Sequence, residues 1–396
     1  MAAPRTLALV LAGGAGSRME LLTERRAKPA LPYAGLYRLI DFPLTNCHHS
    51  RVPDVWVLQQ YQLHSLNNEL ANGRPWDLDR TYGGLRILPP QAGGEAEGFH
   101  EGNADALWRN RELIAEAGRE ELLVMSADAV YTLDYERLLA AHRERGADVT
   151  MVTTEVSREE ATRLGVVQTG DGDRVTGFQY KPGEPATTIA TIEVFAYRTQ
   201  RLLEVLEDLA GADGGLEDFG HALLPRMVED GNAFEYRFDG YWRDVGTVDA
   251  YWESHMDLVE PGRGPVLADP DWPMLTLGVD APPSRIEPTA RLDHGLVSSG
   301  CTVAGAVGRS VLSPGVVVEE GATVTGSVLL HDVRVRAGAR VERAVVDQHA
   351  DIGPGATVGG PDGGITLVGE HARVGAGARV EPGTRVPRGR PPHATG

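Results

Sequence analysis

Lysine is nearly absent from this sequence. Of its 38 cationic side chains, only Lys28 and Lys181 are lysines, and arginine supplies all the others. A compact, strongly hydrated ammonium and a planar guanidinium are not interchangeable where a small anion must be held from one direction. Both lysines precede a proline at the end of an apolar or aromatic segment. Chance survival in an arginine-biased composition is the alternative, but we expect both lysines to contact phosphate.

Cysteine and long apolar runs are also scarce. Cys47 and Cys301 are far apart in sequence, which suggests no disulfide framework and favours a reducing cytoplasm. No segment reaches the ~18 consecutive apolar residues of a membrane helix. The apolar run 7–12 leads into glycines rather than into a small-residue cleavage pattern. We therefore expect a buried first strand there and no signal peptide.

Positive charge is in deficit overall, with a formal net charge of −18. A nucleic-acid backbone requires a basic face, so the charge argues against a nucleic-acid partner. It does not argue against a small phosphorylated ligand, because a local cationic site can exist in an acidic protein.

The chain of 396 residues exceeds the roughly 250–300 residues that one hydrophobic core usually serves, so two domains are expected. Residues 1–258 alternate apolar runs with amphipathic stretches, which is typical of an α/β domain with a mainly parallel sheet. The predicted strands are Leu7–Leu11, Val55–Leu58, Leu122–Met125, Val149–Thr153 and Thr191–Ala196, and the predicted helices are Asp105–Ala117, Tyr135–Arg145, Gln200–Leu209 and His221–Glu229. Residues 259–288 are rich in proline and glycine and are predicted to form a linker.

Residues 289–396 have a different pattern, in which aliphatic side chains recur six residues apart. The pairs are Val318 with Val324, Val335 with Val341, Ile352 with Val358, and Val374 with Val380. The first three pairs are each offset by 17 residues, close to the roughly 18 residues of one three-sided coil, and each encloses a Gly-Ala step. The pattern predicts a left-handed parallel β-helix of hexapeptide repeats.

A glycine-rich segment, Gly13-Gly14-Ala-Gly16-Ser-Arg18, follows the first predicted strand. Glycines let backbone amides approach phosphate oxygens closely, and a following helical turn adds a favourable dipole. The segment lacks the Gly-Lys-Ser/Thr of a P-loop and the glycine spacing of a dinucleotide-binding motif. A plain glycine turn is the alternative, but the cation at Arg18 favours phosphate binding.

Two aspartates are candidates for holding a divalent cation. Asp128 ends the apolar segment Leu122-Leu-Val-Met-Ser-Ala-Asp128, and ligands of open α/β sheets bind at the carboxyl ends of strands. Asp244 lies in Tyr241-Trp-Arg-Asp244-Val-Gly246-Thr. Each aspartate alone is also compatible with a helix cap or a turn. Together with the glycine segment and the two lysines, they indicate phosphoryl transfer.

With these residues identified, the chain resembles the ADP-glucose pyrophosphorylases, also named glucose-1-phosphate adenylyltransferases. The resemblance runs in order over nearly the whole length. It covers the glycine segment with Arg18, Arg26-Ala-Lys28-Pro-Ala, Tyr37-Arg-Leu-Ile-Asp41-Phe, Gln60-Tyr61, Gly102-Asn-Ala104-Asp105-Ala, Tyr241-Trp-Arg-Asp244-Val-Gly246-Thr and the hexapeptide region. It implies a Rossmann-like nucleotidyltransferase domain that is followed by the β-helix.

The resemblance also implies a role for each matching residue. The amides of Gly13, Gly14 and Gly16 would hold the triphosphate, and Arg18 and Lys28 would neutralise it during transfer. Asp128 would be a third catalytic residue. Gln91 and the Gly102–Ala104 backbone would contact adenine. Asp128 and Asp244 would bind Mg²⁺. Lys181 would hold the phosphate of glucose 1-phosphate, with Tyr180 and Gly165 beside it.

The implied reaction is transfer of AMP from ATP to glucose 1-phosphate, giving ADP-glucose and pyrophosphate for glycogen or α-glucan synthesis. Family resemblance further implies a cytoplasmic homotetramer, or a hetero-oligomer with a relative, under allosteric control by anionic metabolites. Arg25 and Arg26 are candidates for binding such an effector, and an ordinary solvated basic pair is the alternative. Neither a nucleic acid nor a membrane is expected as a partner.

The chain departs from the family pattern at the sugar end. Tyr180 stands where the family has a glutamate that would accept hydrogen bonds from sugar hydroxyls, and the segment 182–193 is altered. A phenol cannot replace a carboxylate as a bidentate acceptor. Two alternatives therefore stay open: a non-catalytic or weakly active regulatory subunit, and a nucleotidyltransferase for a different sugar 1-phosphate.

Overall fold

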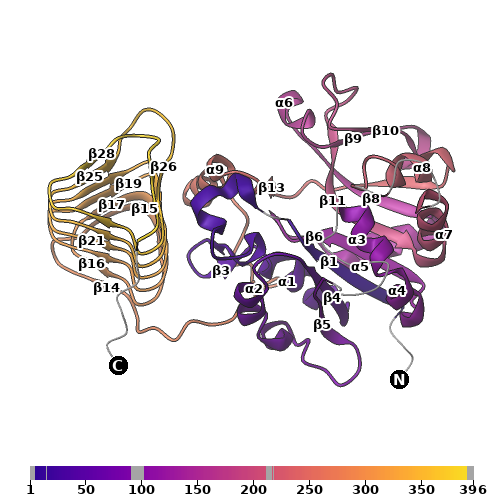
Figure 1. Cartoon of the computed structure of the whole chain (residues 1–396), viewed down its shortest axis with the longest axis horizontal. Helices are drawn as coiled ribbons and strands as arrows, with labels where there is room; N and C mark the ends of the chain where they lie inside the picture. Colours follow the sequence, from indigo (N-terminus) through magenta and orange to yellow (C-terminus); the bar gives the residue numbers. More distant parts are fainter. Residues whose placement is uncertain (1–4, 15, 91–101, 211–215, 217, 390–396) are drawn as a thin grey trace. The chain divides into compact units, whose positions relative to one another are not determined.

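The computed structural model describes residues 5–14, 16–90, 102–210, 216 and 218–389, which are drawn as ribbons in Figure 1. The chain forms two compact units. The first unit comprises Met1–Ala15 and Phe42–Trp242, and the second comprises Gly16–Asp41 and Arg243–Gly396. The domain boundaries at residues 258 and 288 stay predictions, and the sequence did not indicate that residues 16–41 would pack with the C-terminal part of the chain.

The first unit contains a nine-stranded sheet of β1 (Thr6–Ala12), β4 (Asp54–Gln59), β5 (Gly84–Leu88), β6 (Glu121–Ser126), β8 (Val149–Glu155), β9 (Gly165–Thr169), β10 (Val175–Tyr180), β11 (Ile189–Arg198) and β12 (Ala233–Arg237). The main order is β10-β9-β11-β6-β1-β4-β5, and β8 joins β11 to β12. Strands β6, β1, β4 and β5 are parallel, whereas β11 is antiparallel to its neighbours. The predicted fold class of this part is confirmed.

Helices connect these strands: α1 (Asp41–His49), α2 (Leu63–Leu70), α3 (Asn103–Arg109), α4 (Arg111–Ala117), α5 (Tyr135–Glu144), α6 (Arg158–Ala161), α7 (Thr199–Ala210) and α8 (Leu223–Glu229). The single helix predicted over Asp105–Ala117 is wrong in detail, because it is divided into α3 and α4 at Asn110. The backbone of Asn110 is non-helical, and its side-chain amide donates to the Ala106 carbonyl. Among the helices of the described residues, none is long and apolar enough to cross a membrane.

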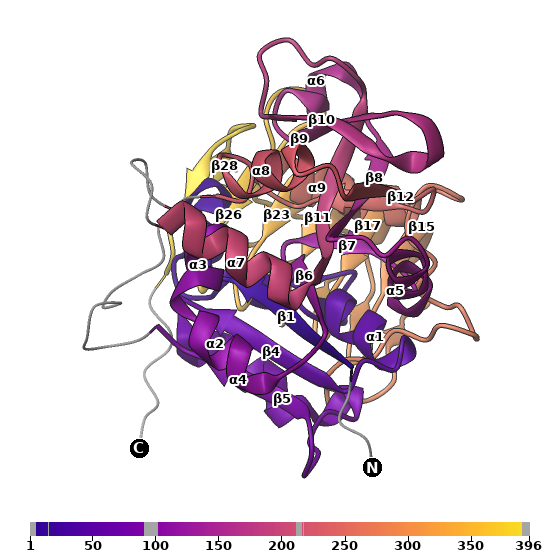
Figure 2. The ribbon, with the colours of Figure 1, turned by 90° about the vertical axis from the view of Figure 1, so that its right-hand side faces the viewer.

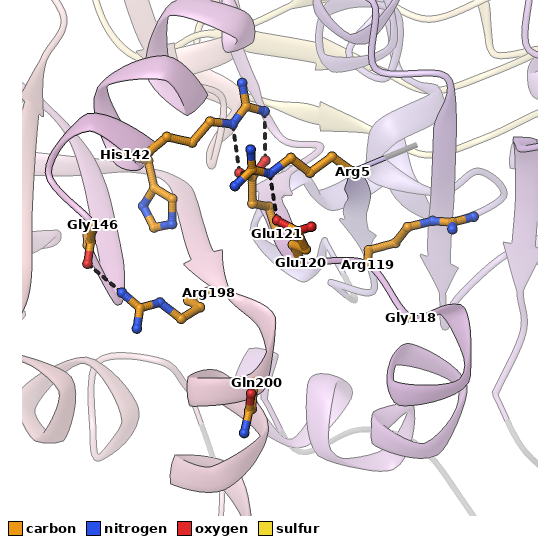
Figure 3. Close-up of a pocket in the computed structure, with 11 residues that line it drawn as sticks. Arg5, Gly118, Arg119, Glu120, Glu121, His142, Gly146, Arg198 and Gln200 are labelled. Atoms are coloured by element: carbon orange, nitrogen blue, oxygen red, sulfur yellow. Dashed lines mark hydrogen bonds and ion pairs between the residues drawn. The ribbon is translucent and has the colours of Figure 1, made fainter. Parts of the chain in front are cut away.

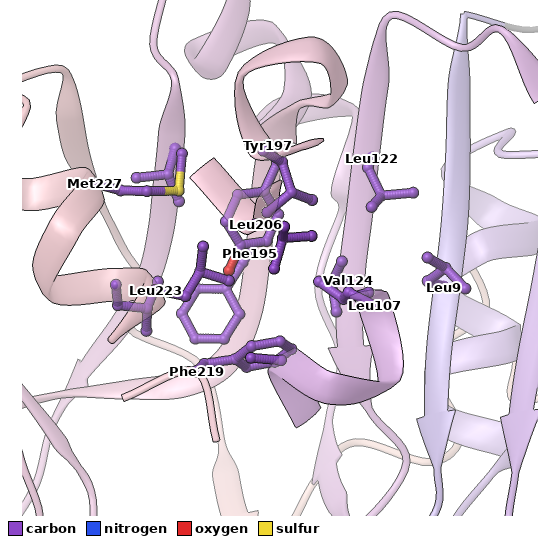
Figure 4. Packing of buried hydrophobic residues seen from close by; sticks show 14 of the residues in the cluster. Leu9, Leu107, Leu122, Val124, Phe195, Tyr197, Leu206, Phe219, Leu223 and Met227 are labelled. Carbon is purple, nitrogen blue, oxygen red and sulfur yellow. The ribbon is translucent and has the colours of Figure 1, made fainter. Parts of the chain in front are cut away.

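One hydrophobic core of the first unit lies between the sheet and α3, α4, α7 and α8. Leu7, Leu9 and Leu11 are in this buried cluster, because alternate side chains of a strand point to the same face. Leu107 of α3 and Leu206 of α7 pack in the same cluster, and Figure 4 shows them with Val124 and Phe195. Figure 2 shows α3, α4 and α7 together over this face.

The second unit contains a solenoid of parallel strands: β14 (Arg285–Ile286), β15 (Arg291–Val297), β16 (Thr302–Val303), β17 (Ala306–Leu312), β18 (Val317–Val318), β19 (Thr323–Thr325), β20 (Val328–Leu329), β21 (Arg334–Val335), β22 (Arg340–Glu342), β23 (Ala344–Val346), β24 (Asp351–Ile352), β25 (Thr357–Gly359), β26 (Thr366–Val368), β27 (Arg373–Val374), β28 (Arg379–Val380) and β29 (Arg385–Val386). The parallel β-helix expected from the hexads is confirmed.

The register of the solenoid follows the predicted repeat. Val318 pairs with Val335 and Val335 with Ile352, each 17 residues apart, and all three side chains are buried in one core. Ile352 then pairs with Val374, 22 residues on. The glycine-rich segment 360–364, between β25 and β26, accounts for this longer step. An insertion therefore lengthens one coil without moving its inward-facing aliphatics off the stack.

The segment Gly16–Asp41 is held against helix α9 (Val248–Val259) within the second unit. The Tyr33 hydroxyl donates to the Ser254 carbonyl at 3.1 Å, and the Tyr251 hydroxyl donates to the Pro32 carbonyl. The Ala34 amide donates to Nε2 of His255 at 3.2 Å, and Nδ1 of that ring lies 2.8 Å from the Tyr251 carbonyl. Because Nε2 accepts, the proton of this neutral imidazole is on Nδ1.

The same segment is also tied to the β-helix. Nη2 of Arg26 donates to both carboxylate oxygens of Asp347, at 2.8 and 3.0 Å, and both residues are buried. Arg385 of β29 pairs with Glu20. The residues from Arg18 to Lys28 thus depend for their position on α9 and on the β-helix.

Candidate active site

A cavity of about 230 Å³ lies at the carboxyl ends of β1 and β4. These strands are parallel neighbours, so the segments that follow them meet at one edge of the sheet. The cavity is lined by Leu11, Gly13, Gly14, Leu58, Gln60, Tyr61, Gly102, Asn103, Ala106 and Asp218. Ligands of open α/β sheets bind at this edge, so the cavity is the candidate nucleotide site of the first unit.

The two glycines after β1 have different surroundings. A side chain on Gly13 would begin 3.2 Å from Oε1 of Gln60, so the backbone packs closely against that amide. A side chain on Gly14 would meet nothing within 4 Å, and Gly14 is exposed. The Gly14 backbone is therefore open to the cavity, as a phosphate-binding role requires.

The α3 side of the cavity begins at Gly102, whose backbone is extended. The amide of Asn103 donates to Oδ1 of Asp218 at 3.3 Å, and Ala104 is buried. The predicted adenine-contacting segment Gly102–Ala104 thus includes part of the cavity wall. Gln91, predicted with it, lies outside the described residues.

Asp218 and Gln60 line the cavity but were not among the site residues predicted from the sequence. Gln60-Tyr61 was part of the resemblance without a stated function. Asp218 precedes Phe219-Gly220 between α7 and α8, and an acid two residues before a glycine was the available signal. The sequence alone does not say that this loop returns to the glycine segment.

Asp128 follows β6 and precedes β7 (Ala129–Tyr131). Its Oδ1 accepts a hydrogen bond from the Ser126 hydroxyl, and its side chain is half-buried. Asp244 ends β13 (Trp242–Asp244), and its side chain is 43% exposed. Carboxylate oxygens suit Mg²⁺, which is commonly held by one or two carboxylates together with substrate phosphates. The donor chemistry of both aspartates fits such a cation.

Within the described ranges, no group of three or more His, Cys, Asp or Glu side chains is gathered to hold a metal ion. Asp128 belongs to the first unit and Asp244 to the second. A site that draws on substrate phosphates requires fewer protein ligands than a closed protein cage, so the finding is compatible with the metal proposed below.

The second unit gathers three of the predicted site residues. Nζ of the buried Lys28 lies 4.0 Å from Oδ1 of Asp244. A side chain on Gly246 would begin 2.8 Å from Oδ2 of Asp244 and 3.4 Å from Nη2 of Arg18. The guanidinium, the ammonium and the carboxylate therefore lie in one group around Gly246.

Gly16 shapes the turn that precedes this group. Its φ of 66° is in the left-handed region that favours glycine. A side chain there would begin 3.1 Å from Cγ2 of Thr23 and 3.3 Å from Cβ of Lys28. The Thr23 hydroxyl also donates to the Gly16 carbonyl at 2.9 Å. Gly16 thus packs on Lys28 and is two residues before Arg18 in the sequence.

The predicted sugar end lies at the end of β10 in the first unit. Nζ of the exposed Lys181 is 4.4 Å from the centroid of the Tyr180 ring. The Tyr180 hydroxyl donates to Oδ2 of Asp218 at 2.8 Å. Burial, together with the Asp218 carboxylate, raises the pKa of Tyr180. The phenol therefore stays protonated at neutral pH and donates its hydrogen bond to Asp218.

Gly165 begins β9 and pairs with Tyr180 across the β9–β10 ladder. A side chain on Gly165 would begin 2.8 Å from Cζ of Phe178. The absence of a side chain makes room for that ring, so a packing role accounts for this glycine.

A larger cavity of about 440 Å³ lies where β1 and β6 begin, at the opposite edge of the sheet (Figure 3). Its four arginines each have a carboxylate partner. The pairs are Arg5 with Glu120, Arg119 with Asp54, Arg143 with Glu121, and Arg198 with Asp148. Because the cations are already balanced, this cavity is a weaker candidate for a polyphosphate than the glycine-lined one.

Comparison with known proteins agrees with both architectures. The family model described as nucleotidyl transferase matches residues 7–260, and the model described as GlmU-like, C-terminal hexapeptide matches residues 284–362. The second match agrees with the left-handed β-helix expected from the hexads.

Relatives match along nearly the whole chain. Proteins named glucose-1-phosphate adenylyltransferase from Thermomicrobium roseum and Acetivibrio thermocellus are 41% and 36% identical over 387 residues, which cover 94% of this chain and 90% and 91% of their own lengths. A third, from Bacillus cereus, is 37% identical over 89% of this chain and 94% of its own. The chain belongs to the glucose-1-phosphate adenylyltransferase family of nucleotidyl transferases.

Proposed function

We propose that this protein transfers the AMP moiety of ATP to glucose 1-phosphate, giving ADP-glucose and pyrophosphate. The observation that carries the proposal is the grouping of Arg18, Lys28 and Asp244 around Gly246. Two cations and a metal-binding acid are the groups that stabilise charge on a transferring phosphoryl centre. The glycine-lined cavity of the first unit supplies a matching nucleotide site.

The reaction is an in-line displacement at the α-phosphorus of ATP. A phosphate oxygen of the sugar phosphate forms the new P–O bond, the bond to the bridging oxygen of the β-phosphate breaks, and pyrophosphate leaves with the electron pair. The nucleophile is already anionic, so the protein needs no covalent intermediate. Rate enhancement then comes from positioning and from charge stabilisation.

Each of the chain's own residues has a distinct part in this proposal. The amides of Gly13, Gly14 and Gly16 orient the triphosphate, and Gly102–Ala104 borders the nucleoside. Arg18 and Lys28 balance the charge that develops on the phosphates. Lys181 holds the phosphate of the sugar substrate.

A divalent cation completes the charge balance, and we propose Mg²⁺ held by Asp128 and Asp244. When bound, it would polarise phosphate oxygens and neutralise charge on the departing pyrophosphate. Removal of Mg²⁺ with EDTA is expected to abolish pyrophosphate release, and restoring Mg²⁺ should recover it.

The test is pyrophosphate release from ATP and Mg²⁺ with a panel of sugar 1-phosphates, including those of glucose, galactose, mannose and glucosamine. Turnover with glucose 1-phosphate as the best acceptor supports the proposal. A different best acceptor supports the second candidate that Tyr180 favours, a nucleotidyltransferase for another sugar. Turnover with none of them contradicts an active enzyme and favours a regulatory subunit.

Assembly and effectors remain proposals from the family resemblance: a homotetramer, or a hetero-oligomer with a relative, that responds to anionic metabolites. Light scattering of the purified chain measures the first. For the second, Arg25 is the exposed member of the basic pair, whereas Arg26 is buried against Asp347. An Arg25→Ala variant with an unchanged response to sugar-phosphate effectors would argue against its role.

A further inference from the structure

Tyr180 links two parts of the first unit through its hydroxyl. The hydroxyl donates to one carboxylate oxygen of Asp218 at 2.8 Å, and the other oxygen accepts the Asn103 amide at 3.3 Å. Asp218 and Asn103 both line the cavity that contains Gly13 and Gly14. Two donors thus fix the orientation of a carboxylate in the wall of the candidate nucleotide site.

The ring of Tyr180 is half-buried and has three close neighbours. Nζ of Lys181 lies over it, 4.4 Å from the centroid, and the His221 ring meets it at 4.8 Å and 83°. A side chain on Gly220 would begin 2.0 Å from Cδ2 of Tyr180. The ring therefore occupies the space that any larger residue at 220 would need.

From these contacts we infer that Tyr180 is a positioning residue, which fixes Asp218 through its hydroxyl and Lys181 through its ring. This inference rests on the proposed function, because it assigns the two held groups to nucleotide and sugar phosphate. The side chain acts through other residues and does not itself accept hydrogen bonds from the sugar. It would thereby couple the two substrate subsites of the first unit.

The hydroxyl is tested with Tyr180→Phe, Asp218→Ala and the double variant, and ATP binding is measured by calorimetry without added metal. Tyr180→Phe keeps the ring over which Lys181 lies and removes only the donor to Asp218. We expect it to weaken ATP binding roughly tenfold, since a hydrogen bond to a charged group is lost. The double variant should bind ATP no more weakly than Asp218→Ala alone, because both changes remove the same link.

The ring is tested with Gly220→Ala, whose added methyl group would displace Tyr180, and with Gly183→Ala as the matched control. Gly183 has nothing within 4 Å of its position for a side chain, and its φ is not in the left-handed region. Gly220→Ala should raise the KM for the sugar 1-phosphate and the KM for ATP together, while Gly183→Ala leaves both within twofold. Adding Tyr180→Leu to Gly220→Ala should cause little further loss.

The outcomes separate this inference from the proposed function. A wild-type protein that releases pyrophosphate, with Tyr180→Phe binding ATP equally well, overturns the inference alone. A wild-type protein that binds ATP without turnover, with Tyr180→Phe tenfold weaker, overturns the proposed function and leaves the link intact. Wild type with no ATP binding contradicts both. Thermal unfolding of each variant, unchanged from wild type, distinguishes positioning from general loss of structure.

Discussion

At the scale of single residues, the surroundings of Lys28 and Lys181 differ, and each explains why a lysine is found there. Lys28 is buried, lies against Gly16 and is 4.0 Å from the Asp244 carboxylate. A guanidinium is larger and planar, and could not take this place without moving its neighbours. Lys181 is exposed and lies over a tyrosine ring. Lys28 is therefore constrained by the limited space around it, whereas Lys181 is constrained by its contact with the Tyr180 ring.

We predict that Lys28→Ala lowers kcat by roughly 100-fold or more, because one charge that stabilises the transition state is lost. Lys28→Arg should lower kcat as well, since the larger group does not fit against Gly16. The control is Arg340→Ala, which removes an exposed cation from β22. Steady-state pyrophosphate release measures all three. A kcat for Lys28→Ala within threefold of wild type would contradict the role given to this ammonium.

The sequence predicted these lysines from their isolation, but it did not identify their neighbours. Asp218 was missed because its partners, Asn103 and Tyr180, are 115 and 38 residues away. Loop-to-loop contacts of this kind leave no periodic pattern in a sequence. The nature of a side chain could thus be recognised, whereas the atoms it contacts required the fold.

At the scale of elements, helix α9 accounts for the position of two motifs. Its N-cap, Thr247, directly follows Asp244–Gly246, and its residues Tyr251, Ser254 and His255 hold the segment around Tyr33. One helix therefore adjoins the turn that contains Asp244 and also contacts the segment that contains Lys28. This helix was not among those predicted from the sequence, and its partner segment lies more than 200 residues earlier in the chain.

The cap of α9 gives a prediction with a matched control. The Thr247 hydroxyl accepts from the Ala250 amide, and the Ser157 hydroxyl caps α6 in the same way. Thr247→Ala and Ser157→Ala should each lower the free energy of unfolding by about 1 kcal/mol. Only Thr247→Ala should also lower kcat, because only this cap adjoins Asp244. Equal kcat values for the two variants, measured beside urea unfolding, would argue against the coupling.

At the scale of the whole molecule, the β-helix contributes to more than its own solenoid. Asp347 holds Arg26 across 321 residues of sequence, and Arg26 is two residues from Lys28. The hexad pattern predicted the solenoid and its 17-residue register, because period and burial are local properties. It did not predict this ion pair, because nothing in the sequence around Asp347 distinguishes an ion-paired aspartate from an ordinary turn residue.

Removing one partner of the buried pair of Arg26 and Asp347 should destabilise the protein strongly. Asp347→Ala leaves the Arg26 guanidinium buried without its partner, and we expect it to lower the free energy of unfolding by about 3–5 kcal/mol. Replacing both residues, as in Arg26→Met with Asp347→Leu, should cost less. The exposed pair of Arg379 with Glu381 is the control, and Glu381→Ala should change stability by at most about 1 kcal/mol. Denaturant unfolding measures each variant.

Stability should also depend on pH through buried histidines in both units. Burial lowers the pKa of His142 in the first unit and of His255 in the second to about 4. The folded state thus keeps these rings neutral, while the unfolded state takes up a proton near its ordinary pKa of about 6.5. Stability is therefore full above pH 6.5 and falls towards pH 4, by roughly 1.4 kcal/mol per pH unit for each histidine.

Urea unfolding between pH 7.5 and 4.5 measures this dependence, with one variant for each unit. His142→Gln and His255→Gln should each reduce the slope of unfolding free energy against pH by roughly 1.4 kcal/mol per pH unit. His294→Gln, at an exposed position, should leave that slope unchanged. Glu121 adds to the loss at the acidic end, because Arg143 and Thr6 hold the pKa of its carboxyl below the ordinary value in spite of burial. A slope that neither buried-histidine variant alters would mean that these rings take up protons without unfolding, and the hydrogen bond between Ala34 and His255 would then carry no pH-sensitive stability.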